Sequence, residues 1–281
     1  IFGLNSSQAV PSAPFSMTVE SGHAVTVSSI FTAMLAAFWG YEGWNSVGYL
    51  GGEIKNPNRN VPLSITIGLL IVIAVYILVN ITYLALLPVP QLVGMNAAKS
   101  SIAAVEAVNV FWGHGGVLFI SLLILVTTLG CTHTTILSNS RTYYAMACEG
   151  VFFTKVSRLN GARVPGHALW YQGIWACLLV LSGTFDQITD MLIFAAFIYY
   201  GATTLGVFIL RKKMPDAPRP YKVWGYPVVP AVFILFCVAL IGNTIVTRTR
   251  EAAIGLTLIL LGIPFYWWFD RRAGEKNKTL Q

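Results

Sequence analysis

Residues 36–62 have the sequence "AAFWGYEGWNSVGYLGGEIKNPNRNVP". The stretch begins inside an apolar run long enough to cross a membrane, yet it contains five glycines and one intramembrane acid, Glu42. Each glycine costs up to about 1 kcal/mol in helix propensity, and an ionised acid near mid-bilayer costs about 2.5–3.5 kcal/mol on insertion scales. Such an acid normally faces a cavity or a partner. The sequence therefore predicts a helix that is broken beside Glu42.

The composition is that of a membrane protein. Of the 281 residues, 56% are hydrophobic and only 10% are charged, whereas a soluble domain carries about 25% charged residues. The mean hydropathy is +0.68. The four cysteines have no paired or metal-ligand spacing, so we expect reduced thiols, no disulfide framework and no metal site.

Seven apolar runs are long enough to span a bilayer, which needs about 20 residues. We predict spans at about 25–50, 62–87, 116–140, 167–185, 191–210, 227–247 and 252–269. Residues 97–112 are predicted to form an amphipathic helix in the membrane interface. The fold class expected from these runs is an all-α integral membrane protein whose first transmembrane helix is discontinuous.

The basic residues orient these spans. With the N-terminus outside, the inner connections hold fifteen of the eighteen lysines and arginines, as the positive-inside rule requires. We therefore expect 1–24 to be the remnant of an extracellular loop, 25–269 the transmembrane domain and 270–281 a cytoplasmic tail. This distribution accounts for the net charge of +7 without a nucleic-acid partner.

Two classes of protein fit seven spans with this orientation: a seven-helix receptor, and the C-terminal part of a larger transporter. A broken span favours the transporter. Freed backbone N–H groups attract a carboxylate and freed carbonyl groups attract an ammonium, so the break has the chemistry of a site for a zwitterionic amino acid. A non-transporting membrane scaffold is a further alternative.

Two neighbouring motifs identify a family. "FWGYEGWN" at 38–45 and "EIKNPNRNVP" at 53–62 together resemble the sixth transmembrane segment and the following loop of the amino acid–polyamine–organocation (APC) superfamily, and most closely the L-type amino acid transporters. "SNSRTYYAMACEGVFF" and "LRKKMPDAPRPYKVWGYPVVP" resemble later parts of the same family. The resemblance implies a LeuT-like inverted-repeat fold, of which this chain would be the C-terminal portion, segments six to twelve.

The resemblance also implies a substrate site. Trp39 stands where the family has a gating aromatic residue, Gly40, Tyr41 and Glu42 occupy the unwound stretch that meets the substrate, and Asn45 matches the asparagine of the "GWN" motif. Animal L-type transporters tend to have glycine where this chain has Glu42, whereas several microbial relatives have an acid. Glu42 is therefore predicted to sense charge or to couple protons.

Three further residues are candidates. Arg59 is predicted either to anchor the chain at the cytoplasmic side or to act in an inner gate, and His133 either to pack against a neighbouring helix or to act in coupling. Phe197, Tyr199 and Tyr200 are interpreted mainly as packing residues. Phe197 is the first choice among them for a substrate contact, because the resemblance aligns it with a pocket aromatic.

The predicted function is secondary active transport of amino acids by alternating access, of neutral L-amino acids by exchange or by proton coupling. No phosphate-binding glycine loop, zinc-ligand spacing or nucleophile motif occurs, so we expect neither an enzyme nor a cofactor. The expected partners are the amino acid substrate, the plasma-membrane bilayer and the N-terminal half of the same transporter. The cysteine that joins some eukaryotic family members to a glycoprotein subunit lies in that other half.

Overall fold

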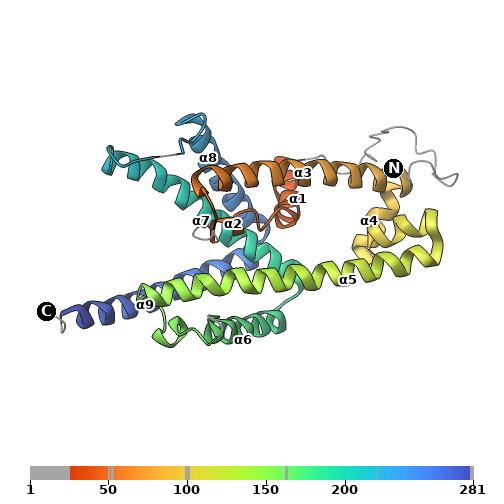
Figure 1. The fold of residues 1–281 in the computed structure, drawn as a ribbon. Coiled ribbons are helices and arrows are strands. Elements are labelled where there is room, and N and C mark those ends of the chain that lie inside the picture. The colour runs from red at the N-terminus through yellow and green to blue at the C-terminus, as the bar shows by residue number, and fades with distance from the viewer. Residues whose placement is uncertain are drawn as a thin grey trace. The chain divides into compact units, whose positions relative to one another are not determined.

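The computed structural model describes residues 26–49, 51, 54–98, 102–161, 164–219 and 221–278. Within these ranges all regular secondary structure is helical, and Figure 1 traces its elements along the chain. The predicted extracellular loop remnant at 1–24 lies outside the described residues. So do residues 279–281 of the predicted cytoplasmic tail.

The chain divides into two compact units. The first contains Pro62–Thr135, and the second contains Ala24–Val61 and Ile136–Gln281. The first unit holds most of α3 (Pro57–Leu86), all of α4 (Val89–Ala98) and α5 (Ala103–Cys148) as far as Thr135. The second unit holds the end of α5, the 3₁₀ turn η3 (Thr154–Ser157) and helices α1 (Val27–Gly40), α2 (Ser46–Tyr49), α6 (Gly166–Ser182), α7 (Phe185–Lys213), α8 (Val228–Thr247) and α9 (Thr249–Lys278).

The first predicted span is broken, as the sequence indicated. Helix α1 ends at Gly40, residues 41–45 form turns, and α2 begins at Ser46. Within the break Gly43 has φ +102°, a backbone conformation that residues with a side chain rarely adopt. The discontinuous first helix of the predicted fold class is therefore confirmed.

Local signals explain where α1 and α7 begin. In α1 the Thr26 side chain accepts a hydrogen bond from the Ser29 backbone N–H, and the Ser29 side chain lies 3.1 Å from the Thr26 backbone N–H, which completes a capping box. Thr184 and Gln187 form the same arrangement at the start of α7. Each capping box satisfies two backbone N–H groups that would otherwise have no intrahelical partner.

The region of the predicted interfacial helix differs in detail. Instead of one helix over 97–112, α4 ends at Ala98 and a new helix begins at Ala103. That helix changes direction at Gly113, which has φ +62° and ψ −155°, before continuing to Cys148. Sequence periodicity did not detect the short helix α4, which follows Pro88 and has Pro90 as its second residue.

Five helices in the described part of the chain are long and apolar enough to cross a membrane: α3, α5, α7, α8 and the Thr249–Phe269 part of α9. Helix α1 is a shorter apolar helix of 14 residues, and α6 has 17 residues. The most apolar 18-residue window of α3 has mean hydropathy 2.6, and none of it is buried inside the protein. Such a surface requires lipid or further protein to cover it. The count of seven spans stays a prediction.

The main core of the second unit lies where α1, α7 and α8 meet. Its buried members are Leu35, Ile193, Phe197, Cys237 and Leu240. Glycine permits the close packing of these helices: a Cβ atom added at Gly201 would lie 3.3 Å from the Cys237 Cβ atom, and one added at Gly255 would lie 3.2 Å from the Phe194 ring. Small residues at helix contacts are typical of membrane bundles.

Candidate functional site

The polar side chains of the break point to one residue on α7. The Tyr200 hydroxyl donates to Glu42 Oε1 at 2.6 Å, and Asn45 Nδ2 donates to the same hydroxyl oxygen at 3.2 Å. A phenol has a single hydrogen and can accept through its lone pairs, so both bonds can form together. Through Glu42 and Asn45, Tyr200 thus connects the chain before and after Gly43 to α7.

The Glu42–Tyr200 bond is short, at 2.6 Å, and lies within the usual range for O–H···O hydrogen bonds. All three residues, Glu42, Asn45 and Tyr200, are half-buried. Glu42, an acid that would be costly in a continuous membrane helix, is therefore held by a specific partner within the protein.

The backbone at the break follows tight turns in place of the α-helical ladder. The N–H groups of Tyr41 and Glu42 donate three residues back, to Phe38 and Trp39, at 3.1 Å each. Ser46 donates to the Gly43 carbonyl at 3.1 Å as the chain re-enters a helix. A helix that ends and restarts leaves several N–H and C=O groups without intrahelical partners, and in a membrane these are tolerated only beside a cavity or a ligand.

Aromatic rings pack the side of the break that faces α7 and α8. Phe38 lies 4.7 Å from Phe197 and 5.7 Å from Phe236, measured between ring centroids. Phe197 in turn lies 5.8 Å from Tyr200 and is only 5% exposed. Phe197 is thus a core residue in this conformation, and its predicted substrate contact stays a prediction.

Two partly exposed tryptophans flank the break, and both contact α7. Trp39, the second-last residue of α1, packs edge-on against Phe185 with ring centroids 5.0 Å apart, and Trp44 lies 5.6 Å from Tyr200. Each indole is 44% exposed. Both rings are therefore only partly held by packing in this conformation.

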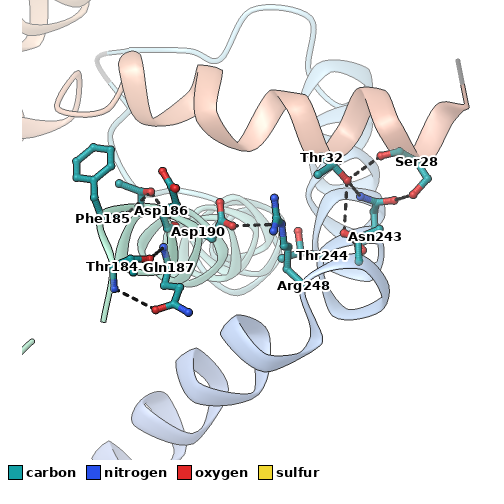
Figure 2. A network of polar contacts seen from close by, with 12 residues as sticks. Ser28, Thr32, Thr184, Phe185, Asp186, Gln187, Asp190, Asn243, Thr244 and Arg248 are labelled. Atoms are coloured by element: carbon teal, nitrogen blue, oxygen red, sulfur yellow. Dashed lines mark hydrogen bonds and ion pairs between the residues drawn. The ribbon is translucent and has the colours of Figure 1, made fainter. Parts of the chain in front are cut away.

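A second polar network joins the start of α1 to α8 (Figure 2). Ser28 Oγ donates to Asn243 Oδ1 at 2.6 Å, and Asn243 Nδ2 donates to Thr32 Oγ1 at 3.3 Å. The hydroxyl groups of Thr32 and Thr247 lie 3.5 Å apart. Every group in this network is neutral.

Figure 2 also shows an ion pair between the start of α7 and the turn after α8. Arg248 Nε lies 3.4 Å from Asp190 Oδ2. The arginine is about half exposed and the aspartate is largely covered. The pair joins the α8–α9 turn to α7.

The structure brings some of the predicted site residues together and leaves others apart. Glu42 and Asn45 meet at Tyr200, and Trp39 lies at the end of the same broken helix. Arg59 is exposed in the first turn of α3, and His133 is exposed on α5 within the Pro62–Thr135 unit. In the described ranges no three His, Cys, Asp or Glu residues are grouped so that they could hold a metal ion.

Sequence reasoning did not select Tyr200, which has the most polar contacts at the break. A signal was present, because Tyr200 follows Phe197 by three positions and residues three apart lie on one face of a helix. A pocket aromatic at 197 therefore implied that Tyr200 faces the same way. Asn243, an amide inside the apolar run 227–247, likewise indicated a polar contact within the bundle.

Comparisons with known proteins show which proteins this chain is similar to. A family model described as "Amino acid permease" matches residues 3–269. The "Serine/threonine exchanger SteT" of Bacillus subtilis is 33% identical over 243 residues, which cover 85% of this chain and 55% of that protein. The human "b(0,+)-type amino acid transporter 1" is 30% identical over 251 residues, covering 88% of this chain and 50% of that protein.

A more distant similarity extends to the human "Large neutral amino acids transporter small subunit 2". It is 25% identical over 242 residues, which cover 86% of this chain and 44% of that protein. The chain thus spans about half the length of the curated relatives that it matches.

Proposed function

This chain belongs to the amino acid permease family, and on that premise we propose that it forms part of a secondary active transporter that carries amino acids across a membrane by alternating access. The family consists of transporters rather than enzymes, and the long apolar helices agree with a multi-pass membrane protein. Family membership does not favour the receptor or scaffold alternatives.

The observation that carries the proposal is the break between α1 and α2, with its polar side chains held by α7. The carbonyl end of α1 bears partial negative charge and favours the substrate ammonium group, whereas N–H groups of the turn favour the carboxylate. In this proposal Gly40, Tyr41 and Asn45 meet the substrate backbone, and Trp39 closes over it. Phe197 would reach the substrate only after α1 moves away from α7.

We also propose that Glu42 responds to charge. The hydrogen bond from Tyr200 to the Glu42 carboxylate is weakened when the carboxylate is protonated, and an incoming ammonium group competes for the same oxygen. Either event would loosen the break from α7. The carriage of neutral L-amino acids, by exchange or by proton coupling, is part of this proposal. The name of the serine/threonine exchanger supports exchange, and the name of the large neutral amino acids transporter subunit supports neutral substrates.

Roles for Arg59 and His133 are also part of the proposal. Arg59 would act in an inner gate or as a basic anchor at the cytoplasmic surface, and His133 in coupling. The proposed orientation, with the start of the chain outside and its end in the cytoplasm, is supported by the positions of the basic residues. A plasma-membrane location is part of the same proposal.

The test is counterflow in proteoliposomes with the complete native reading frame and a panel of labelled amino acids. Uptake of at least one neutral amino acid is expected, and Trp39→Ala should abolish it. Trp224→Ala is the matched control, since Trp224 is a highly exposed tryptophan in the turn before α8. Absence of uptake of every amino acid by folded, inserted protein would refute the proposal.

The role of Glu42 is tested separately, by comparing counterflow at two pH values. Glu42→Gln should flatten the pH dependence of uptake, because the amide keeps the shape of the side chain but cannot ionise. Glu149→Gln, at an exposed position just after α5, should leave that dependence as in the unaltered protein. An unchanged pH profile in Glu42→Gln would exclude Glu42 from coupling without affecting the transport assignment.

A further inference from the structure

A groove of about 320 Å³ opens between α6, α7 and α9, among residues that do not belong to the break between α1 and α2. Its wall is apolar and includes Trp175, Leu178, Ile188, Ile254 and Leu258. The Trp175 and Leu178 side chains are 50% and 54% exposed. A pocket of this size is at the lower end of the range for small-molecule sites, about 300–1,000 Å³.

The polar groups of the groove gather at one end of it. Ser182 lies at the end of α6, Gln187 in the first turn of α7, and Arg250 and Glu251 in the first turn of α9. All three helix ends belong to the same surface of the bundle. One cation and one anion therefore stand side by side at the mouth of an otherwise apolar groove.

The length of the groove excludes a very small ligand. From Arg250 to Leu258 the chain advances eight residues along α9, which is about 12 Å at about 1.5 Å per residue. Trp175 and Ser182 are a similar distance apart along α6. A ligand that fills this groove has a charged head and an apolar tail that is longer than an amino acid side chain.

The small volume of the groove argues against a protein helix as its occupant. A helix with its side chains is about 10–12 Å across, and a helix from another protein would need a broad face rather than a groove of about 320 Å³. The molecules that surround helices of this hydropathy, and that combine a charged head with an apolar chain, are membrane lipids.

We propose that this groove binds a phospholipid whose headgroup carries a primary ammonium group, such as phosphatidylethanolamine. The phosphate lies against Arg250, the ammonium group against Glu251, and an acyl chain runs along the wall towards Leu258. The paired charges select this headgroup: an anionic headgroup would leave Glu251 facing a negative charge, and a choline headgroup has no N–H to donate to it. The site does not depend on amino acid transport.

The experiment is native mass spectrometry of the complete protein released from nanodiscs that contain equal amounts of phosphatidylethanolamine, phosphatidylcholine and phosphatidylglycerol. The protein should retain phosphatidylethanolamine in preference to the other two by about tenfold, the size of effect of one charge-assisted hydrogen bond. Leu258→Trp fills the groove and should remove this preference. Leu261→Trp, one turn further along α9 and outside the groove, should keep it.

Headgroup recognition is tested by single-charge variants. Glu251→Gln should equalise phosphatidylethanolamine and phosphatidylcholine while phospholipid is still retained, and Arg250→Gln should weaken retention of all three. Equal retention by Leu258→Trp and Leu261→Trp would overturn the proposal. A preference of the unaltered protein for phosphatidylglycerol, or displacement of the lipid by free amino acids, would overturn it as well.

Discussion

The two ends of α1 are attached to the bundle by different chemistry. At its start, Ser28 and Thr32 share neutral hydrogen bonds with Asn243 on α8. At its broken end, Glu42 and Asn45 share Tyr200 on α7. The shortest bond at each end has the same length, 2.6 Å, but only the second one involves an acid.

That difference indicates how the helix can move. Neutral hydrogen bonds between membrane helices contribute only about 0.6 kcal/mol on average, and neither pH nor a charged solute alters them directly. A hydrogen bond to a carboxylate contributes about 1.5–3 kcal/mol and is weakened by protonation or by a competing ammonium group. In the proposed mechanism the start of α1 is thus a constant attachment, and the break is the end that a substrate or a proton releases.

The largest effect is expected from Gly43→Val, which removes the backbone freedom on which the break depends. A residue with a side chain at φ +102° is strained, at a cost of about 1–3 kcal/mol or more for a β-branched side chain. Counterflow should fall roughly 10- to 100-fold, since 1.4 kcal/mol corresponds to about tenfold. Gly48→Val is the matched control, because a Cβ atom there meets nothing within 4 Å and no positive φ is involved. Equal loss of counterflow in both variants would show that transport does not depend on the positive φ of Gly43.

A smaller effect is expected from Tyr200→Phe, which keeps the ring but removes the hydroxyl between Glu42 and Asn45. Counterflow should fall about tenfold, since the carboxylate loses a hydrogen bond worth about 1.5–3 kcal/mol, and its pH dependence should change. Tyr199→Phe alters the neighbouring, exposed tyrosine and should have little effect. Combining Tyr200→Phe with Glu42→Gln should add little to either change alone, because each removes the same charge-assisted hydrogen bond: Tyr200→Phe deletes the donor and Glu42→Gln neutralises the acceptor. Additive losses would show that the two residues act independently.

The smallest effect is expected from Asn243→Leu, which removes the neutral attachment at the start of α1. The melting temperature should fall by about 2 °C, in line with a loss of about 0.6 kcal/mol, and the pH dependence of counterflow should stay unchanged. Ser28→Ala combined with Asn243→Leu should cost no more than Asn243→Leu alone. A shift in the pH profile of Asn243→Leu would remove the distinction between the two ends.

Much of the fold could be predicted from the sequence because membrane helices are specified locally. The apolar runs and the glycines around Glu42 each act within a few positions of the chain, and the structure has a helix break where these patterns predicted one. The capping boxes at Thr26 and Thr184, seen in the structure, are equally local. The short helix α4 and the onset of a new helix at Ala103 were not predicted, because a ten-residue segment carries too few positions for a clear period.

The candidate site was predicted only in part. The sequence by itself determined that an acid and an asparagine stand in a broken membrane helix, since insertion cost and helix propensity depend on residue type alone. Only the tertiary structure decided that both contact Tyr200, which is 158 positions from Glu42, that Phe197 is packed into the core, and that Arg250 and Glu251 stand over an apolar groove. These facts depend on which helix faces are packed together, and that packing is set by the shapes of side chains far apart in the chain.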